Sequence, residues 1–197
     1  MRMKNILLSA GLLLLALVLS GCGTDKPKFT SVDITGADYA RGFALTDHTG
    51  KARTLADFKG KAVVIFFGYT QCPDVCPTTM AEMSSVMQAL GKDAERVQVL
   101  FVTVDPERDK PEFLASYVPN FDQRFLGLYG DVATTEKVTK EFKVYVAKVA
   151  GKTPTSYTID HTAGSYVFDP AGHIRLFVRH GQGAEPIVHD LKILLGS

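Results

Sequence analysis

The sequence lacks the features that mark several large classes of protein. It has no cluster of Lys and Arg, and its 22 basic residues nearly balance 21 acidic ones, so nothing indicates a nucleic-acid-binding protein. It has no internal repeat and no low-complexity tract, and 197 residues with 46% hydrophobic composition are typical of one globular domain. Its long N-terminal apolar run covers about fourteen residues, 6–19, which is short of the roughly 20 that cross a membrane.

The N-terminus has the pattern of an exported protein. Arg2 and Lys4 precede the apolar run, and small residues follow it, which is typical of a secretory signal peptide. Residues 19–22, Leu-Ser-Gly-Cys, resemble the bacterial lipobox, in which the cysteine is lipidated. We therefore expect a signal peptide over 1–21, a lipidated Cys22 with a flexible tether over 22–38, and a folded domain over 39–197. An uncleaved anchor and ordinary secretion are the alternatives. The protein is expected at a membrane, facing the periplasm or the cell exterior.

Cysteine is scarce, and its placement is informative. With Cys22 assigned to lipid, Cys72 and Cys76 form the one remaining pair of the three cysteines. They follow the apolar run 63–67, and Pro77 suits the first turn of a helix. Thiols at a helix N-terminus are expected to have a lowered pKa, and thiolate is both a nucleophile and a ligand for soft metals. A disulfide that closes a loop of about five residues would constrain the unfolded chain little. The pair therefore indicates redox chemistry, metal chemistry or both.

The remaining elements predict an α/β protein with a thioredoxin-like fold. A short hairpin is expected around 43–54, and a second hairpin at 165–169 and 173–178 precedes a terminal helix. The order predicts a central mixed β-sheet flanked by helices, with an N-terminal β-hairpin extension and insertions. The other expected strands are 61–67, 97–104 and 143–149, and the expected helices are 78–90, 111–118, 134–142 and 185–195.

A second segment, residues 157–166, precedes the third long strand of the proposed sheet. In a thioredoxin-like fold the loop that leads into this strand faces the dithiol turn, and thioredoxins place a cis-proline there. This chain has His161 and Thr162 instead. Two thiolates and one imidazole suit copper or zinc. A structural zinc site needs four protein ligands, and no obvious fourth is present. The pattern therefore favours a site that accepts copper and passes it to another protein.

Four motifs resemble the Sco (SenC) family, and they extend over roughly residues 40–195. They occupy residues 68–77, 104–109, 160–162 and 168–172, in the order and spacing of that family. The resemblance implies a thioredoxin-like, membrane-tethered protein that binds Cu(I) or Cu(II) through Cys72, Cys76 and His161. It also implies a role in assembling the binuclear copper centre of cytochrome c oxidase. The implied partners are the oxidase copper subunit and a copper donor protein.

Three carboxylates within these motifs need an interpretation of their own. Asp160 is a candidate for orienting the imidazole of His161, because ligating histidines usually donate their second N–H to an oxygen, but a solvated loop carboxylate is an equal alternative. Asp105 is a candidate for shaping the metal pocket. Asp109 is expected to cap the helix that begins at Pro111.

Other residues of metal-binding type are expected to be structural or exposed. Met80, Met83 and Met87 have helical spacing, which predicts a core face and not a thioether copper tract. The remaining histidines are predicted at the surface; they are His48, His173, His180 and His189.

Two functions compete at this stage. The leading hypothesis is a copper metallochaperone. The alternative is a thiol–disulfide oxidoreductase that uses Cys72 and Cys76 as a redox dithiol, able to form a disulfide, and reduces the cysteines of the oxidase copper subunit. Three residues separate these cysteines, where thioredoxins have two, and His161 stands near the expected cis-proline position, so simple oxidoreductase action is disfavoured. A peroxidase is disfavoured because no Arg lies near the dithiol in sequence.

Overall fold

The structure is a computed structural model, and it describes residues 28–153 and 156–197. The predicted signal peptide, Cys22 and the first part of the predicted tether lie outside the described residues. Among the described residues, no helix is long and apolar enough to cross a membrane.

The centre of the molecule is a mixed eight-stranded sheet with the order β1-β10-β9-β4-β5-β6-β2-β3. β4 pairs in parallel with β5 and antiparallel with β9. The predicted mixed sheet and the N-terminal hairpin, β2–β3, are confirmed. The strands of this sheet are β1 (Val32–Asp33), β2 (Ala44–Asp47), β3 (Ala52–Thr54), β4 (Ala62–Gly68), β5 (Val97–Thr103), β6 (Leu126–Tyr129), β9 (Ser165–Phe168) and β10 (Ile174–Val178).

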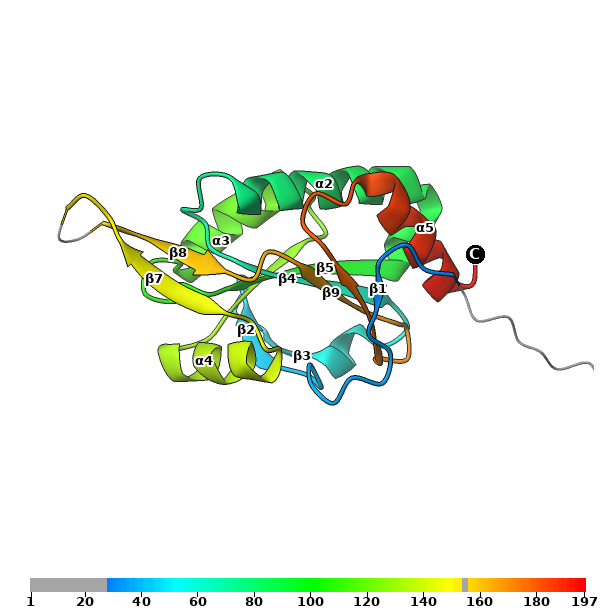
Figure 1. The fold of residues 1–197 in the computed structure, drawn as a ribbon, viewed down its shortest axis with the longest axis horizontal. Coiled ribbons are helices and arrows are strands. Elements are labelled where there is room, and N and C mark those ends of the chain that lie inside the picture. The colour runs from blue at the N-terminus through cyan, green and yellow to red at the C-terminus, as the bar shows by residue number, and fades with distance from the viewer. Residues whose placement is uncertain (1–27, 154–155) are drawn as a thin grey trace, which may run out of the picture.

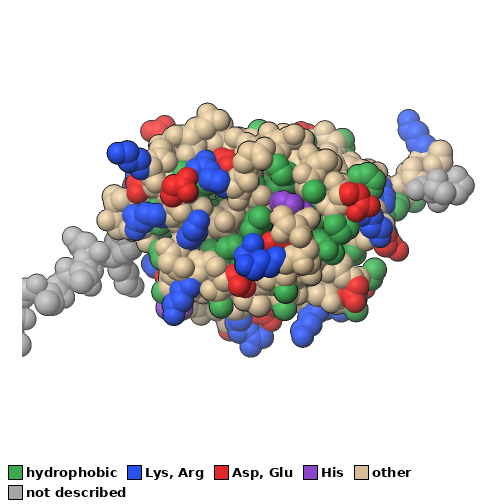
Figure 2. Space-filling view, turned by 180° about the vertical axis from the view of Figure 1, so that it is seen from behind, with side chains coloured by type: hydrophobic (Ala, Val, Ile, Leu, Met, Phe, Trp, Pro, Cys, Tyr) green, Lys and Arg blue, Asp and Glu red, His purple; other side chains and the backbone are tan. Residues whose placement is uncertain are grey.

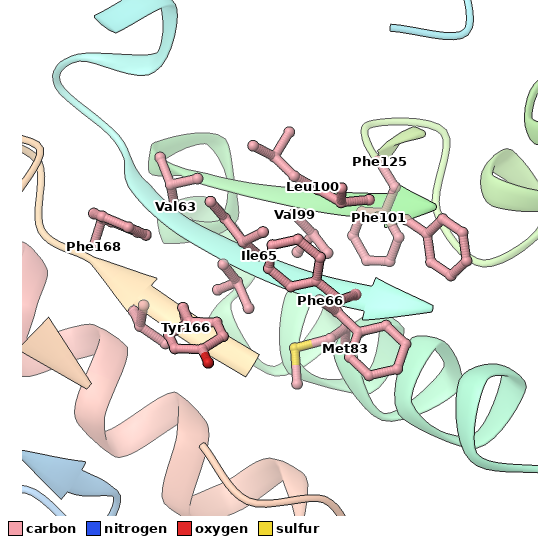
Figure 3. Close-up of a cluster of buried hydrophobic side chains, with 14 of the residues drawn as sticks. Val63, Ile65, Phe66, Met83, Val99, Leu100, Phe101, Phe125, Tyr166 and Phe168 are labelled. Atoms are coloured by element: carbon pink, nitrogen blue, oxygen red, sulfur yellow. The ribbon is translucent and has the colours of Figure 1, made fainter. Parts of the chain in front are cut away.

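The two central parallel strands are buried along their whole length. Every residue of β4 and of β5 is buried, as expected for strands covered on both faces. Phe66 and Phe101 lie side by side on these strands, with ring centroids 6.1 Å apart. Figure 3 shows them between Met83 of the covering helix and the apolar side chains of neighbouring strands. The residues that follow β4 therefore begin from a strand that is packed on both faces.

Helices cover both faces of the sheet. α2 (Val75–Leu90) and α5 (Ala184–Leu195) lie together on one face, and α4 (Val132–Glu141) lies on the other (Figure 1). The three methionines of α2 are buried, so their predicted role in the core is confirmed. The shorter helices are α3 (Pro111–Tyr117) and the 3₁₀ turns η1 (Leu55–Phe58), η2 (Gly91–Arg96) and η3 (Val118–Asn120).

The N-terminal boundary differs from the prediction. Val32 and Asp33, within the predicted tether, pair with β10 as strand β1. The backbone N–H groups of Thr30 and Ser31 donate to the carboxylate of Asp190 on α5, at 2.8 Å each. The ordered domain therefore begins before residue 39. The polar composition of this segment concealed a strand that is too short to show periodicity.

Two further strands were not predicted. β6 has only four residues, one of them Gly127, which weakens any strand pattern. Residues 157–161 were expected as a loop, but they form β8 (Tyr157–His161), which pairs antiparallel with β7 (Val146–Ala150) in a separate two-stranded sheet. This hairpin projects from one end of the molecule (Figure 1).

Charged side chains of both signs are interspersed over the face opposite to that of Figure 1, and apolar side chains gather near its middle (Figure 2). No single-sign block dominates this face, which agrees with the near balance of 22 basic and 21 acidic residues in the sequence.

Candidate metal centre

The dithiol lies where β4 ends and α2 begins. Cys72 is in the connecting turn, and Cys76 is in the first turn of α2 and has no exposed surface. The backbone N–H of Cys76 donates to the Sγ of Cys72 across 3.4 Å. Both cysteines are free thiols. Cys76, inside the helix, is therefore buried, and Cys72, in the turn, is half-buried.

The hairpin β7–β8 brings His161 to this dithiol. His161 is the last residue of β8, and its Nε2 lies 3.5 Å from the Sγ of Cys76. The ligand atoms of Cys72, Cys76 and His161 all lie within 4.8 Å of one another, and no other such group of His, Cys, Asp and Glu occurs within residues 28–153 and 156–197. The rings of Phe66 and Tyr69 pack against the imidazole, with centroids 6.0 Å away.

The hydrogen bonds assign the tautomer of His161. Its Nδ1 lies 3.0 Å from the carbonyl oxygen of Thr162, so Nδ1 carries the proton and the lone pair of Nε2 points to Cys76. Burial lowers the pKa of His161, which favours the neutral, ligating imidazole.

The thiol of Cys76 does not behave as the helix dipole alone predicts. Burial raises the pKa of Cys76, and the nearby Cys72 adds to that effect, so the expectation of a lowered pKa is wrong for this residue in the metal-free protein. The S–H of Cys76 donates to Nε2 of His161. A bound metal ion would take the place of that proton, because metals bind thiolate and not thiol.

Asp160 does not hold the imidazole of His161. The carbonyl of Thr162 takes the Nδ1 proton, and Asp160 is exposed at the mouth of the site, next to the ligand. Its charge opposes the lowering of the pKa of His161, but burial has the larger effect. The interpretation of a solvated carboxylate fits the structure better.

Asp105 is fully buried and contacts the start of β8. Its carboxylate accepts from the hydroxyl of Tyr157 at 2.8 Å and from Nε of Arg108. Asp105 therefore contacts the strand that carries His161 at its first residue, and we expect any effect of Asp105 on the site to act through that strand.

Asp109 does not cap α3, whose N-cap residue is Lys110. Its buried carboxylate instead accepts from the backbone N–H of Thr70 at 3.0 Å, from the hydroxyl of Thr70 at 2.6 Å and from the hydroxyl of Thr103 at 2.6 Å. Burial raises the pKa of Asp109 although these hydrogen bonds oppose the effect. This residue ties the dithiol loop to β5, and the prediction of a helix cap was wrong.

Two residues beside the site were missed by the sequence analysis. The hydroxyl of Tyr69 accepts from the backbone N–H of Ile159 at 3.2 Å, and the guanidinium of Arg108 contacts both Tyr157 and Gln71. Both residues lie inside motifs described above, 68–77 and 104–109. Tyr69 directly precedes the dithiol loop, which was an available signal, whereas Arg108 is far from the dithiol in sequence and only the fold brings it to the site.

The candidate centre opens to the surface. A groove of about 360 Å³ runs between the dithiol loop and β8, and Cys72 and His161 both line it. An ion held by these residues would therefore have protein ligands on its inner side and an accessible outer side.

Comparison with known proteins identifies the family. The SCO1/SenC family model matches residues 32–196, almost all of the described chain. The chain belongs to the SCO1/SenC family. The matched range also begins before residue 39, in agreement with the position of β1.

Solved structures of the SCO1/SenC family share the fold. "Structure of Bradyrhizobium japonicum ScoI with copper bound" is 45% identical, with a TM-score of 0.72, over 78% of this chain and 98% of that chain. Apo Sco1 from Thermus thermophilus is 36% identical, with a TM-score of 0.76, over 85% of this chain and 98% of that chain.

Curated relatives in this family include longer proteins. The mitochondrial protein SCO2 homolog of Danio rerio is 40% identical over 132 residues, which are 66% of this chain and 47% of that protein. The chain thus spans about half the length of this relative.

Proposed function

We propose that this SCO1/SenC protein is a copper metallochaperone that binds copper through Cys72, Cys76 and His161 and assists assembly of the binuclear copper centre of cytochrome c oxidase. The observation that carries the proposal is the convergence of two sulfurs and one imidazole nitrogen within 4.8 Å. The copper-bound relative from Bradyrhizobium japonicum, at 45% identity, supports the choice of metal.

The donor set suits a metal that is held and then released. Thiolates select soft ions such as Cu(I), and imidazole also suits Cu(II). Three protein ligands leave a coordination position on the side of the groove, where a ligand of the receiving protein is able to approach. The proposed partners are a copper donor protein and the copper subunit of the oxidase.

The proposed location follows from the N-terminal sequence. We propose removal of residues 1–21, lipidation of Cys22 and attachment to a membrane on its periplasmic or external side. Mass spectrometry of the membrane fraction should find a lipid-modified N-terminus at Cys22, and a Cys22→Ser variant should lose it. An N-terminus at another residue, or an unprocessed chain, would contradict this part of the proposal.

Copper titration of the reduced protein tests the main proposal. Wild type should bind one tight equivalent with thiolate-to-Cu(II) charge-transfer absorption, and Cys72→Ser, Cys76→Ser and His161→Ala should each lose tight binding. His173→Ala is the matched control, because this histidine is largely exposed in a turn of the β9–β10 hairpin. Full copper affinity in the His161→Ala variant would disprove the ligand assignment.

A thiol–disulfide oxidoreductase is the second candidate, and the bond from the Cys76 N–H to the Cys72 sulfur favours it. The Cys72 thiolate would attack a partner disulfide, forming a mixed disulfide and releasing one partner thiolate. The Cys76 thiolate would then attack the sulfur of Cys72, which releases the second partner thiolate and leaves a Cys72–Cys76 disulfide. Two electrons pass to the partner. Reduction of a disulfide substrate that is unaffected by His161→Ala would favour this function.

A further inference from the structure

We propose that Arg108 is a positioning residue for the candidate metal centre: its guanidinium holds the strand that ends at His161 against the loop that carries Cys72. This inference deepens the proposed function and rests on it. Arg108 lies in the connection between β5 and α3, inside the motif 104–109, but that motif does not indicate what its side chain contacts.

The strand that carries His161 needs such a contact. β8 pairs with β7 alone in the described chain, and this pair is not part of the main sheet. The backbone hydrogen bonds of the main sheet therefore do not fix where the imidazole lies relative to Cys76. The short link 162–164 to β9 and side-chain contacts between the hairpin and the body of the domain do so instead.

One nitrogen of Arg108 contacts both halves of the centre. Its Nη1 donates to the backbone carbonyl of Tyr157, the first residue of β8, at 3.0 Å. The same Nη1 lies 3.3 Å from Oε1 of Gln71, which directly precedes Cys72 in the sequence. A single guanidinium group thus joins the His-bearing strand to the dithiol loop.

The guanidinium is itself held in place from two sides. Its Cζ lies 3.6 Å from the centroid of the Tyr157 ring, a close cation–π contact, and its Nε donates to the buried carboxylate of Asp105. The hydroxyl of Tyr157 donates to the other oxygen of Asp105 at 2.8 Å. Arg108, Tyr157 and Asp105 therefore form a closed set in which each member contacts the other two.

The planar group of arginine is specifically required here. Arg108 donates from Nε and from Nη1 in different directions and also stacks on a ring. Only a guanidinium, with its forked donors and flat face, can do both. Lysine at this position would keep the charge but would offer one ammonium group and no planar face. Arg108→Lys therefore removes the positioning contacts while it conserves charge and approximate length.

The experiment compares Arg108→Lys with wild type in two states. In the reduced, metal-free protein, hydrogen exchange of the β8 amides should be about tenfold faster or more in the variant. In the Cu(II)-loaded protein, the magnetic coupling of copper to an imidazole nitrogen should weaken or become heterogeneous, and copper affinity should fall by about tenfold or more.

Arg175→Lys is a matched control. Arg175 is 24% exposed against 21% for Arg108, and it too pairs with an aspartate, Asp169, and lies over an aromatic ring, that of Phe29. Its substitution should leave the hydrogen-exchange rates of the β8 amides and the coupling of Cu(II) to the imidazole nitrogen unchanged. Tyr157→Phe provides a second test, because it removes the hydroxyl bond to Asp105 and keeps the ring, and it should produce a smaller change in the same direction.

The outcomes separate the two proposals. Absence of tight copper binding in wild type would overturn the proposed function, while the metal-free exchange measurement would still test the contact between Arg108 and β8. The positioning role would be overturned if Arg108→Lys had the same β8 amide exchange rates and the same Cu(II)–imidazole coupling as wild type. Equal changes in Arg175→Lys would also overturn it, since they would show a general loss of stability.

Discussion

The sulfur of Cys76 and the Nε2 atom of His161 lie 3.5 Å apart although 85 residues separate them in the sequence. The sulfur is fixed by the first turn of α2, and the nitrogen is at the end of a hairpin outside the main sheet. A helix turn therefore positions one donor, whereas side-chain contacts and the short link to β9 position the other.

Gly68 provides the space for the Cys76 sulfur. A Cβ at this position would lie 2.9 Å from that sulfur and 2.9 Å from the Phe66 ring. Gly68→Ala should destabilise the fold by about 1–3 kcal/mol and displace the thiol, because a close-packed core has no room for the methyl group. Denaturant unfolding measures the first effect, and copper affinity measures the second.

Gly127→Ala is the control for that substitution. Its added Cβ would lie 3.1 Å from atoms of Leu114 and of Val118, which are part of the core but not of the metal centre. It should lower stability without a specific loss of copper affinity. A Gly68→Ala variant with the affinity of Gly127→Ala would show that Gly68 has no particular role at the thiol.

Asp109 is expected to control the dithiol loop. Its carboxylate accepts hydrogen bonds from Thr70 and Thr103, and an amide at this position would present a donor group to these donors. Asp109→Asn should therefore lower stability by about 1–3 kcal/mol and make Cys72 more reactive toward a thiol reagent, because the loop is released. Glu112→Gln, which changes an exposed carboxylate in the first turn of α3, should have neither effect. Unchanged Cys72 reactivity in Asp109→Asn would contradict this role.

The sequence was sufficient to predict the sheet centre and the three residues that the structure brings together, Cys72, Cys76 and His161. β4 has a strong pattern because it is buried along its whole length, and α2 has one because its buried residues recur at helical spacing. β8 was missed although Thr158 and Asp160 alternate with apolar residues, which is a strand pattern, because a thioredoxin-like fold was expected to have a loop at this position.

Long-range side-chain partners were harder to predict than strands. The expectation for Asp109 failed because a carboxylate just before a helix usually caps it, and only the tertiary fold brings Thr70 within reach. Likewise, the helix dipole predicted an acidic thiol at Cys76, but complete burial outweighs the dipole. Burial depends on the whole fold, and a local motif does not reveal it.

Asp190 fastens the N-terminal segment to α5. Its carboxylate accepts from the backbone N–H groups of Thr30 and Ser31, and hydrogen bonds to a charged group contribute about 1.5–3 kcal/mol each. Asp190→Ala should lower the free energy of unfolding by about 3 kcal/mol or more, because both bonds are lost, and speed hydrogen exchange at Val32. Glu185→Gln, which alters an exposed carboxylate on the same helix, is the control. Slow exchange at Val32 in the Asp190→Ala variant would show that pairing with β10 alone holds β1.

Asp47 should make the stability of the protein depend on pH in acid. Burial alone would raise the pKa of this carboxyl group, but hydrogen bonds from Thr49, Arg53 and Lys51 outweigh burial and lower the pKa from 3.8 to about 2. Because the folded state binds this proton more weakly than the unfolded state, the contribution is complete above about pH 4 and is lost as the pH falls toward 2. It amounts to about 2 kcal/mol at most.

Urea denaturation at pH 5, 4, 3 and 2 measures this effect as the difference between wild type and Asp47→Asn. Wild type should lose about 2 kcal/mol more than the variant over that range, since the variant has no carboxyl group to protonate at this position. Asp38→Asn controls for the loss of one negative charge, because the Asp38 side chain is 93% exposed. Parallel curves for wild type and Asp47→Asn would mean that the hydrogen bonds to Asp47 do not favour its ionised form, and that the β2–β3 turn owes its stability to packing alone.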